Sequence, residues 1–196
     1  MFPLTNEERL LLLRLARQTL ETRLENKQAG ELLGDAFQFT ATLRARAGVF
    51  VSLHRSGELR GCVGVVEPRL PLYRAVIDAA IAASLHDPRF SPVAAAELLE
   101  IDVEISVLSQ PLPITIEEIR IGLHGLIVTR GQARGLLLPQ VAVERQWSPE
   151  RFLEETCRKA GLARDAWLSG TRVEAFQADV FGEKKRTAEW ARQSLL

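Results

Sequence analysis

The sequence lacks an excess of charge of either sign and has very few cysteines. Its 196 residues include 25 Lys and Arg and 25 Asp and Glu, so the formal net charge is zero. General nucleic-acid binders usually carry a strong basic excess, and this balance therefore disfavours nucleic acid as a partner. The two cysteines, Cys62 and Cys157, are too few for a disulfide-stabilised scaffold or a four-cysteine zinc site.

Long hydrophobic runs are also missing. No stretch of about 18 apolar residues occurs, so the sequence predicts no transmembrane helix. Glu7 and Glu8 precede the first apolar stretch, which is the wrong charge order for a secretory signal. We therefore expect a soluble, cytoplasmic protein. Apolar residues make up 46% of the chain, enough for a core in one domain or in one domain with two lobes.

The first predicted helix has a clear start. Thr5 is followed three residues later by Glu8, which is the spacing of a capping box. Leucines then recur at helical spacing with Arg and Gln between them. This pattern predicts an amphipathic helix over about residues 6–28.

Two similar segments follow, at about residues 48–109 and 122–181, within a single domain that spans residues 1–196. Each predicts a β-hairpin, a helix and a further strand, the last strand being Arg172–Phe181. The two return strands share a pair of residues, Arg60-Gly61 and Arg134-Gly135. We therefore predict an α+β fold of pseudo-duplicated β-β-α-β halves, with a mainly antiparallel sheet flanked by helices and room for two unequal lobes.

The most unusual segment is Leu59-Arg60-Gly61-Cys62-Val63-Gly64. Glycines inside a strand allow a bulge, or the close approach of a ligand or another backbone. Strand alternation places Arg60, Cys62 and Gly64 on one face, where the guanidinium would favour a thiolate that acts as a nucleophile. The alternative is that Cys62 is a small core residue.

A catalytic thiol also needs a base, and the sequence offers three histidines, His54, His86 and His124. If the hairpin turn is Ser56-Gly57, regular alternation places His54 on the face opposite Cys62. His86 is followed by Asp87, which could orient its ring. Each histidine alone is more often a surface or structural residue than a catalytic base.

Acidic residues and glycines give no strong cofactor signal. Asp102 and Glu104 share a strand face, where paired carboxylates serve acid–base chemistry or a cation, but a solvated outer face explains them as well. The histidines and acids lack tight metal-ligand spacing, so we expect no metal. The glycine pairs in the hairpins do not match phosphate-binding loops, and no cofactor is evident. Leu136–Ala142 predicts a buried strand leading into a turn, in which Gln140 is the one polar side chain.

Leu59–Gly64 resembles the hallmark Leu-Arg-Gly-Cys-Ile-Gly motif of the AMMECR-domain family, whose prokaryotic members are called AmmeMemoRadiSam system protein A. The one departure is Val63 in place of Ile. The resemblance extends over almost the whole chain. The other matching segments are Gly48–Leu53, Asp87–Phe90, Ile105–Ser109, His124–Val128, Gly135–Ala142 and Thr156–Leu162.

The resemblance implies an α+β fold with two related halves, and two partners: a Memo-like protein and a radical-SAM protein. It implies no reaction. We take the protein to be a ligand-binding or interaction component of that system, with a thiol-dependent enzyme as the alternative and a nucleic-acid-binding module as a third, weaker hypothesis. The candidate catalytic residues are Cys62 and Arg60. The candidate ligand-binding residues are Gly61, Gly64, Asp87, Arg89 and Gln140.

Overall fold

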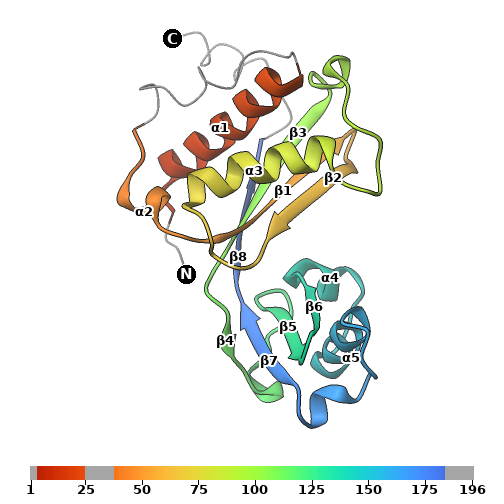
Figure 1. Ribbon diagram of the computed structural model, residues 1–196. Helices are drawn as coiled ribbons and strands as arrows, with labels where there is room; N and C mark the ends of the chain where they lie inside the picture. The colour runs from red at the N-terminus through yellow and green to blue at the C-terminus, as the bar shows by residue number, and fades with distance from the viewer. Residues whose placement is uncertain (1–3, 25–37, 184–196) are drawn as a thin grey trace. The chain divides into compact units, whose positions relative to one another are not determined.

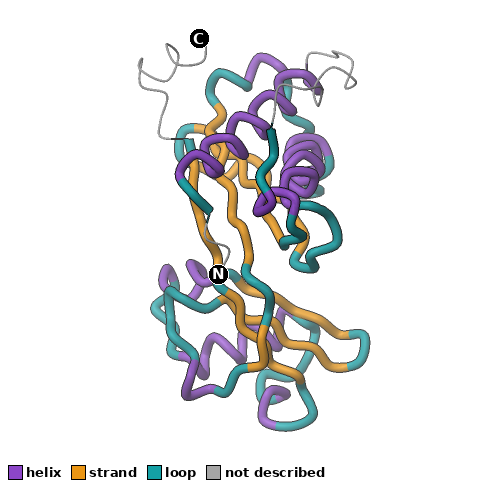
Figure 2. Tube along the Cα trace, turned by 90° about the vertical axis from the view of Figure 1, so that its left-hand side faces the viewer, coloured by secondary structure: helices purple, strands orange, loops and turns teal. Residues whose placement is uncertain are grey.

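The computed structural model describes residues 4–24 and 38–183, which form two compact units. The larger unit contains residues 4–107, apart from 25–37, together with residues 180–183, and the smaller unit contains residues 108–179. Each unit has its own hydrophobic core. Figure 2 shows that the strands of each unit gather side by side, with helices beside them.

The larger unit begins with α1 (Asn6–Leu24). The backbone N–H of Thr5 donates to Glu8 Oε2 at 2.9 Å and the N–H of Glu8 donates to Thr5 Oγ1 at 3.2 Å, which confirms the capping box. The predicted end of this helix, residues 25–28, lies outside the described residues. A short helix, α2 (Ala41–Arg44), follows.

The sheet of the larger unit has the strand order β2-β1-β3-β8, so β2 lies at one edge. α3 packs against β1 and β2, and α1 packs on α3 (Figure 1). The bounds of these elements are β1 (Gly48–Arg55), β2 (Glu58–Val65), α3 (Leu72–Leu85), the 3₁₀ turn η2 (Ala95–Glu97), β3 (Ile101–Leu108) and β8 (Ala178–Gly182).

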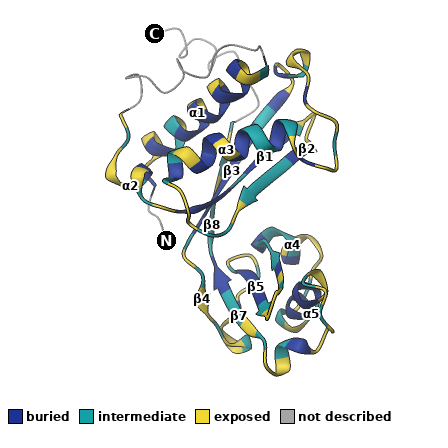
Figure 3. Cartoon of the chain, in the orientation of Figure 1, coloured by how far each residue is buried: buried dark blue, intermediate teal, exposed yellow. Residues whose placement is uncertain are grey.

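The two faces of this sheet differ in burial. Val49, Val51 and Leu53 of β1 are fully buried in the core with the helices. The intervening Ser52 and His54 are only half-buried. This period of two is that of a strand with one face packed and the other polar. Figure 3 shows β1 as mostly buried and β2 as mostly half-buried, as expected for a central and an edge strand.

The sheet of the smaller unit has the order β4-β7-β5-β6. α5 packs against β5 and β6, and Ser148 caps its first turn by accepting a hydrogen bond from the N–H of Arg151. The elements are β4 (Leu112–Pro113), η3 (Ile116–Glu118), β5 (Gly125–Arg130), β6 (Ala133–Leu137), α4 (Pro139–Glu144), α5 (Pro149–Lys159), η4 (Ala166–Leu168) and β7 (Arg172–Phe176).

The two units repeat one arrangement. In each, a hairpin supplies an edge strand and its neighbour, and the strand that follows the helix pairs next to them. A glycine of each return strand lies against the covering helix. A Cβ on Gly61 would lie 2.2 Å from the carbonyl oxygen of Ala83, and one on Gly135 would lie 2.5 Å from that of Thr156. The predicted α+β fold of duplicated halves is confirmed, with antiparallel hairpins in both sheets.

Two predicted strands were wrong in extent. Arg172–Phe181 forms β7 and β8, which belong to different sheets. The break falls at Gln177, whose N–H donates to Ser109 Oγ instead of to a neighbouring strand. Leu136–Ala142 was predicted as a strand leading into a turn; the strand ends at Leu137, and α4 takes the place of the turn, because Pro139 occupies the first turn of that helix. Within residues 4–24 and 38–183, no helix is both long and apolar enough to cross a membrane.

Candidate functional site

The β1–β2 hairpin carries a β-bulge at Arg60. Leu53 pairs with Gly61 and His54 pairs with Leu59, so Arg60 has no partner on β1. A bulge adds one residue to one strand and locally breaks the alternation of side chains. Gly61 accounts for the position of the bulge, because this glycine has no side chain and its backbone packs against Ala83 of α3.

The bulge reverses the prediction for His54. Beyond the bulge, Cys62 pairs with Ser52, and Ser52 and His54 are two residues apart on β1. Cys62 and His54 therefore lie on the same face of the sheet. The prediction of opposite faces was wrong, because the bulge inserts one residue into β2. Cys62 is half-buried and free, and Ser52 Oγ donates to its Sγ at 3.2 Å.

The backbone of Cys62 is bound by two side chains from the segment after α3. Its N–H donates to Asp87 Oδ2 at 2.8 Å, and its carbonyl oxygen accepts from Arg89 Nη2 at 3.2 Å. Because β2 is an edge strand, these backbone groups face away from β1 and need such partners. We call Asp87 and Arg89, bound to the backbone of Cys62, the edge cap.

The edge cap is an ion pair in which the carboxylate is buried and the guanidinium is exposed. Arg89 donates from Nε to Asp87 Oδ1 at 2.9 Å and from Nη2 to Asp87 Oδ2 at 2.7 Å. The Asp87 side chain is 3% exposed, whereas that of Arg89 is 55% exposed. The hydrogen bond from Arg89, reinforced by the N–H groups of Cys62 and Arg89, holds the pKa of Asp87 far below its usual range despite burial.

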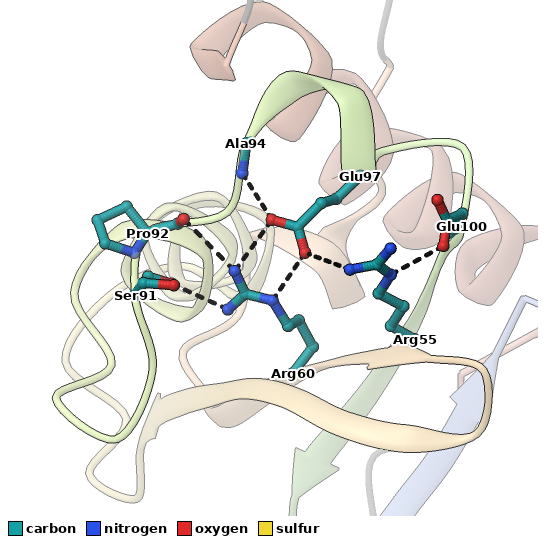
Figure 4. Close-up of polar contacts among 7 residues, drawn as sticks. All are labelled: Arg55, Arg60, Ser91, Pro92, Ala94, Glu97 and Glu100. Carbon is teal, nitrogen blue, oxygen red and sulfur yellow. Dashed lines mark hydrogen bonds and ion pairs between the residues drawn. The ribbon is translucent and has the colours of Figure 1, made fainter.

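Arg60 belongs to a separate cluster, which Figure 4 shows. Its Nε and Nη2 donate to the two carboxylate oxygens of Glu97 at 2.9 and 3.0 Å, a bidentate pair. The remaining nitrogen, Nη1, donates to the carbonyl oxygen of Ser91 at 2.9 Å, and Nη2 donates also to that of Pro92 at 3.4 Å. The predicted role of Arg60 beside the Cys62 thiol finds no support in these contacts, because all three guanidinium nitrogens are engaged with the segment after α3.

Glu97 is the centre of this cluster. Its Oε1 also accepts from the N–H of Ala94 at 2.9 Å, and its Oε2 accepts from Arg55, which in turn binds Glu100 (Figure 4). The hydrogen bond from Arg60, followed by that from Ala94, lowers the pKa of Glu97 from 4.5 to about 2. Sequence reasoning missed Glu97. It occupies the N3 position of a capping box, but the N-cap residue is Ala94 and not the usual Ser or Thr.

The two glycines of the motif serve close backbone contacts. A Cβ on Gly64 would lie 2.2 Å from the carbonyl oxygen of Val49 and 2.6 Å from the ring of Phe50. Gly61 meets α3 in the same way. Backbone approach therefore explains both positions, and their role as ligand contacts stays a prediction.

Other candidate residues belong to the smaller unit, whereas the edge cap belongs to the larger one. Gln140 belongs to α4 of the smaller unit, and its buried Oε1 has no hydrogen-bond partner within residues 4–24 and 38–183. Cys157 is fully buried in α5, where burial raises the pKa of its thiol, so it is a packing residue as expected. His124 also lies in the smaller unit.

Polar residues continue across the sheet face that carries Cys62. His54 Nε2 lies 3.9 Å from Glu104 Oε1 on β3, and Asp102 shares that face by alternation. In the part of the chain that the structure describes, no group of three His, Cys, Asp or Glu residues is arranged to hold a metal ion. The face can donate and accept hydrogen bonds, and it presents one thiol and one imidazole.

Comparisons with known proteins agree over most of the chain. The AMMECR1 family pattern matches residues 13–181. A protein of Methanothermobacter thermautotrophicus is 48% identical over 192 residues, covering 92% of this chain and 97% of its own, and one of Thermofilum pendens is 46% identical, covering 92% of each. The crystal structure of an uncharacterised protein from Pyrococcus horikoshii superimposes with a TM-score of 0.79 at 43% identity, covering 88% of this chain and 90% of that one. This chain belongs to the AMMECR1 family.

Proposed function

We propose that this protein is a binding component, which uses the surface around the edge cap to engage a Memo-like protein and a radical-SAM protein. The resemblance to AmmeMemoRadiSam system protein A suggests these partners. The observation that carries the proposal is the state of Arg89: its guanidinium is held by Asp87 and by the Cys62 carbonyl, yet its side chain remains 55% exposed.

A charged side chain held in this way is suited to recognition. Ordering a long side chain on binding costs free energy, and a guanidinium that is already ordered avoids most of that cost. Arginine and aromatic residues are frequent among the residues that dominate interface affinity. The Arg89 guanidinium lies 5.4 Å from the centre of the Phe90 ring, and the exposed Leu59 and Val65 of β2 add apolar area in the same unit.

The other charged groups near Cys62 support binding over catalysis. Arg60 is paired with Glu97, and Asp87 is paired with Arg89 and bound to the Cys62 amide. An oxyanion-stabilising group must have donors free to meet developing charge. All three guanidinium nitrogens of Arg60 form hydrogen bonds within the protein. The motif therefore has a structural role and supports the surface.

Co-elution tests the proposal. The protein is mixed with the Memo-like and radical-SAM proteins of the same organism and run on a size-exclusion column, with the Arg89→Ala and Arg74→Ala variants alongside. Arg74 is the matched control, because it is 49% exposed and paired with Asp78 on α3 of the same unit. We expect a complex that Arg89→Ala weakens at least about tenfold and that Arg74→Ala leaves unchanged. Absence of any complex, or equal effects of the two variants, would contradict the proposal.

A second candidate function is a thiol-dependent enzyme with Cys62 as the nucleophile. The observation that favours it is the bulge, because it brings His54 to the face of Cys62, with Glu104 3.9 Å from the imidazole. Residues diagonal to one another across two strands have Cβ atoms about 7 Å apart, which long side chains can bridge. A Cys–His–Glu arrangement of this kind is the pattern of an activated thiol.

Thiol labelling distinguishes the two functions. Iodoacetamide modification of Cys62 is followed from mildly acidic to mildly alkaline pH in a Cys157→Ala background, with and without His54→Gln. The binding proposal predicts a rate typical of a free thiol that His54→Gln leaves unchanged. The enzyme alternative requires faster labelling near neutral pH and a loss of about tenfold in His54→Gln.

A further inference from the structure

The smaller unit contains a pocket of about 340 Å³ that belongs to neither cluster around Cys62. It opens where residues 109–114 run beside residues 175–177, and a third segment, residues 118–124, supplies its polar end. This volume is within the range of pockets that hold small organic ligands.

Hydrogen bonds and close packing hold together the segments that line the pocket. The N–H of Ser109 donates to the carbonyl oxygen of Gln177 at 2.9 Å, and the N–H of Gln177 donates back to Ser109 Oγ at 2.9 Å. Phe176 is 1% exposed and its ring lies over Gly125, where a Cβ would come within 2.3 Å of the ring. The glycine therefore allows the ring to form an apolar floor next to the backbone of His124.

His124 is positioned in the pocket wall as a hydrogen-bond donor. The N–H of Arg120 donates to His124 Nδ1 at 3.3 Å, so in the neutral ring the proton resides on Nε2, which is left to donate. Burial, with the charge of Arg120, lowers the pKa of His124 and favours that neutral ring.

Glu118 supplies the complementary acceptor. Its Oε2 accepts from the N–H of Thr115 at 2.9 Å, and this bond lowers the pKa of Glu118 and keeps the carboxylate ionised. Among the described residues that line the pocket there is no Lys or Arg, so its one formal charge is negative. Arg120, whose charge acts on His124, is exposed and is not among the lining residues, so the lining itself favours an uncharged ligand over an anion.

Two primary amides complete the polar lining. Gln110 is exposed and Gln177 is half-buried, and within residues 4–24 and 38–183 neither side-chain amide is bonded to another protein group, so both are available to a ligand from solvent. Each side-chain amide offers a donor and an acceptor side by side. That pairing matches a cyclic amide, which presents N–H and C=O on adjacent ring atoms.

We propose that this pocket binds an uncharged heterocycle that carries a cyclic amide and is the size of a free nucleobase or nucleoside. Gln110 and Gln177 would pair with its amide edge, His124 would donate to a further acceptor, and Phe176 would support the apolar part of the ligand. The inference does not depend on the proposed partners, since every lining residue lies in the smaller unit and the edge cap lies in the larger one.

Amide-detected NMR titration with uridine tests this site, with uridine 5′-monophosphate as the charged comparison. We expect saturable shifts at residues 109–114 and 175–177, and at least about tenfold weaker binding of the monophosphate. Gln177→Ala removes one pairing amide and is expected to weaken uridine binding about tenfold. Gln132→Ala, at an exposed turn of the same unit, is the matched control and leaves binding unchanged.

Three results would overturn the proposal: no saturable shift with uridine at millimolar concentration, equal binding of the monophosphate, or equal loss in the two glutamine variants. Spectra of the unliganded variants establish that each is folded. Because the partner proteins are absent from the titration, its failure leaves the co-elution result standing, and the reverse also holds.

Discussion

Arg60 illustrates how a residue in the most distinctive segment of the chain can be structural. All three of its guanidinium nitrogens are bonded: Nε and Nη2 to Glu97, and Nη1 to a backbone carbonyl oxygen, and its side chain is 14% exposed. Lysine would keep the charge but lose the fork that makes the bidentate pair.

Arg60→Lys is therefore expected to destabilise the protein by about 2 kcal/mol, since charged hydrogen bonds to a partly buried carboxylate are lost. Arg74→Lys changes an exposed helix pair and is expected to cost less than about 0.5 kcal/mol. Urea unfolding of the two variants measures the difference. Equal stabilities would mean that Arg60 is free for another role.

Glu97 makes stability depend on pH in the acidic range. Its pKa is lowered on folding from 4.5 to about 2, so its contribution is complete above pH 4.5 and is lost as the pH falls toward 2. Asp87, whose pKa is also lowered, contributes in the same direction.

We expect urea midpoints that fall steeply below pH 4.5 in the wild type and less steeply in Glu97→Gln, which has no carboxyl group to protonate. Glu104→Gln, whose side chain is 41% exposed, is the control and keeps the wild-type slope. A Glu97→Gln profile parallel to that of the wild type would show that Glu97 is not the linked group.

At the scale of single elements, the edge strand β2 depends on side chains from outside the sheet. Asp87 and Arg89 satisfy the outward-facing N–H and C=O of Cys62, where a neighbouring strand would otherwise pair. The segment after α3 therefore covers part of the edge of the sheet at β2 and also holds Arg89 in place.

Asp87→Ala removes the acceptor for the Cys62 amide and leaves Arg89 without its carboxylate. We expect amide hydrogen exchange at Cys62 to accelerate about tenfold or more, with a loss of about 2 kcal/mol in stability. Asp78→Ala on the exposed side of α3 is the matched control. If the Cys62 amide is equally protected in both variants, the edge cap does not hold this strand.

The sequence predicted these elements well but not their register. Thr5 and Glu8 carry a local cap signal, and the structure confirms the helix start that they indicate. The glycines of Leu59–Gly64 indicated that a bulge was allowed, but not that it would fall at Arg60, because its position depends on the fit of Gly61 against Ala83 of α3, 22 residues away in sequence. One inserted residue was enough to place His54 on the other face.

The strand Arg172–Phe181 failed for a related reason. No Gly or Pro interrupts this stretch in the sequence, yet Gln177 pairs with Ser109 and divides it between two sheets. The hydrophobic pattern reports that a residue faces a core and does not report which of two cores it faces. Pairing partners such as Glu97 with Arg60 are invisible for the same reason, because they lie 37 residues apart.

At the scale of the whole molecule, the zero net charge and the family membership favour binding through specific contacts over general electrostatic attraction. A protein with 25 basic and 25 acidic residues has no general attraction to polyanions, so the partner binding that we propose requires local groups that are held in place. The edge cap is such a group, with a buried carboxylate that orders an exposed guanidinium.

The most direct test of this account is a hydrogen-exchange footprint of the complex with the Memo-like and radical-SAM proteins. We expect new protection at residues 59–65 and 87–90, on β2 and the edge cap, and the Arg89→Ala variant to lose that protection while Arg74→Ala retains it. A complex that forms but protects only other segments, or protection that survives Arg89→Ala, would contradict the claim that this surface is the binding site.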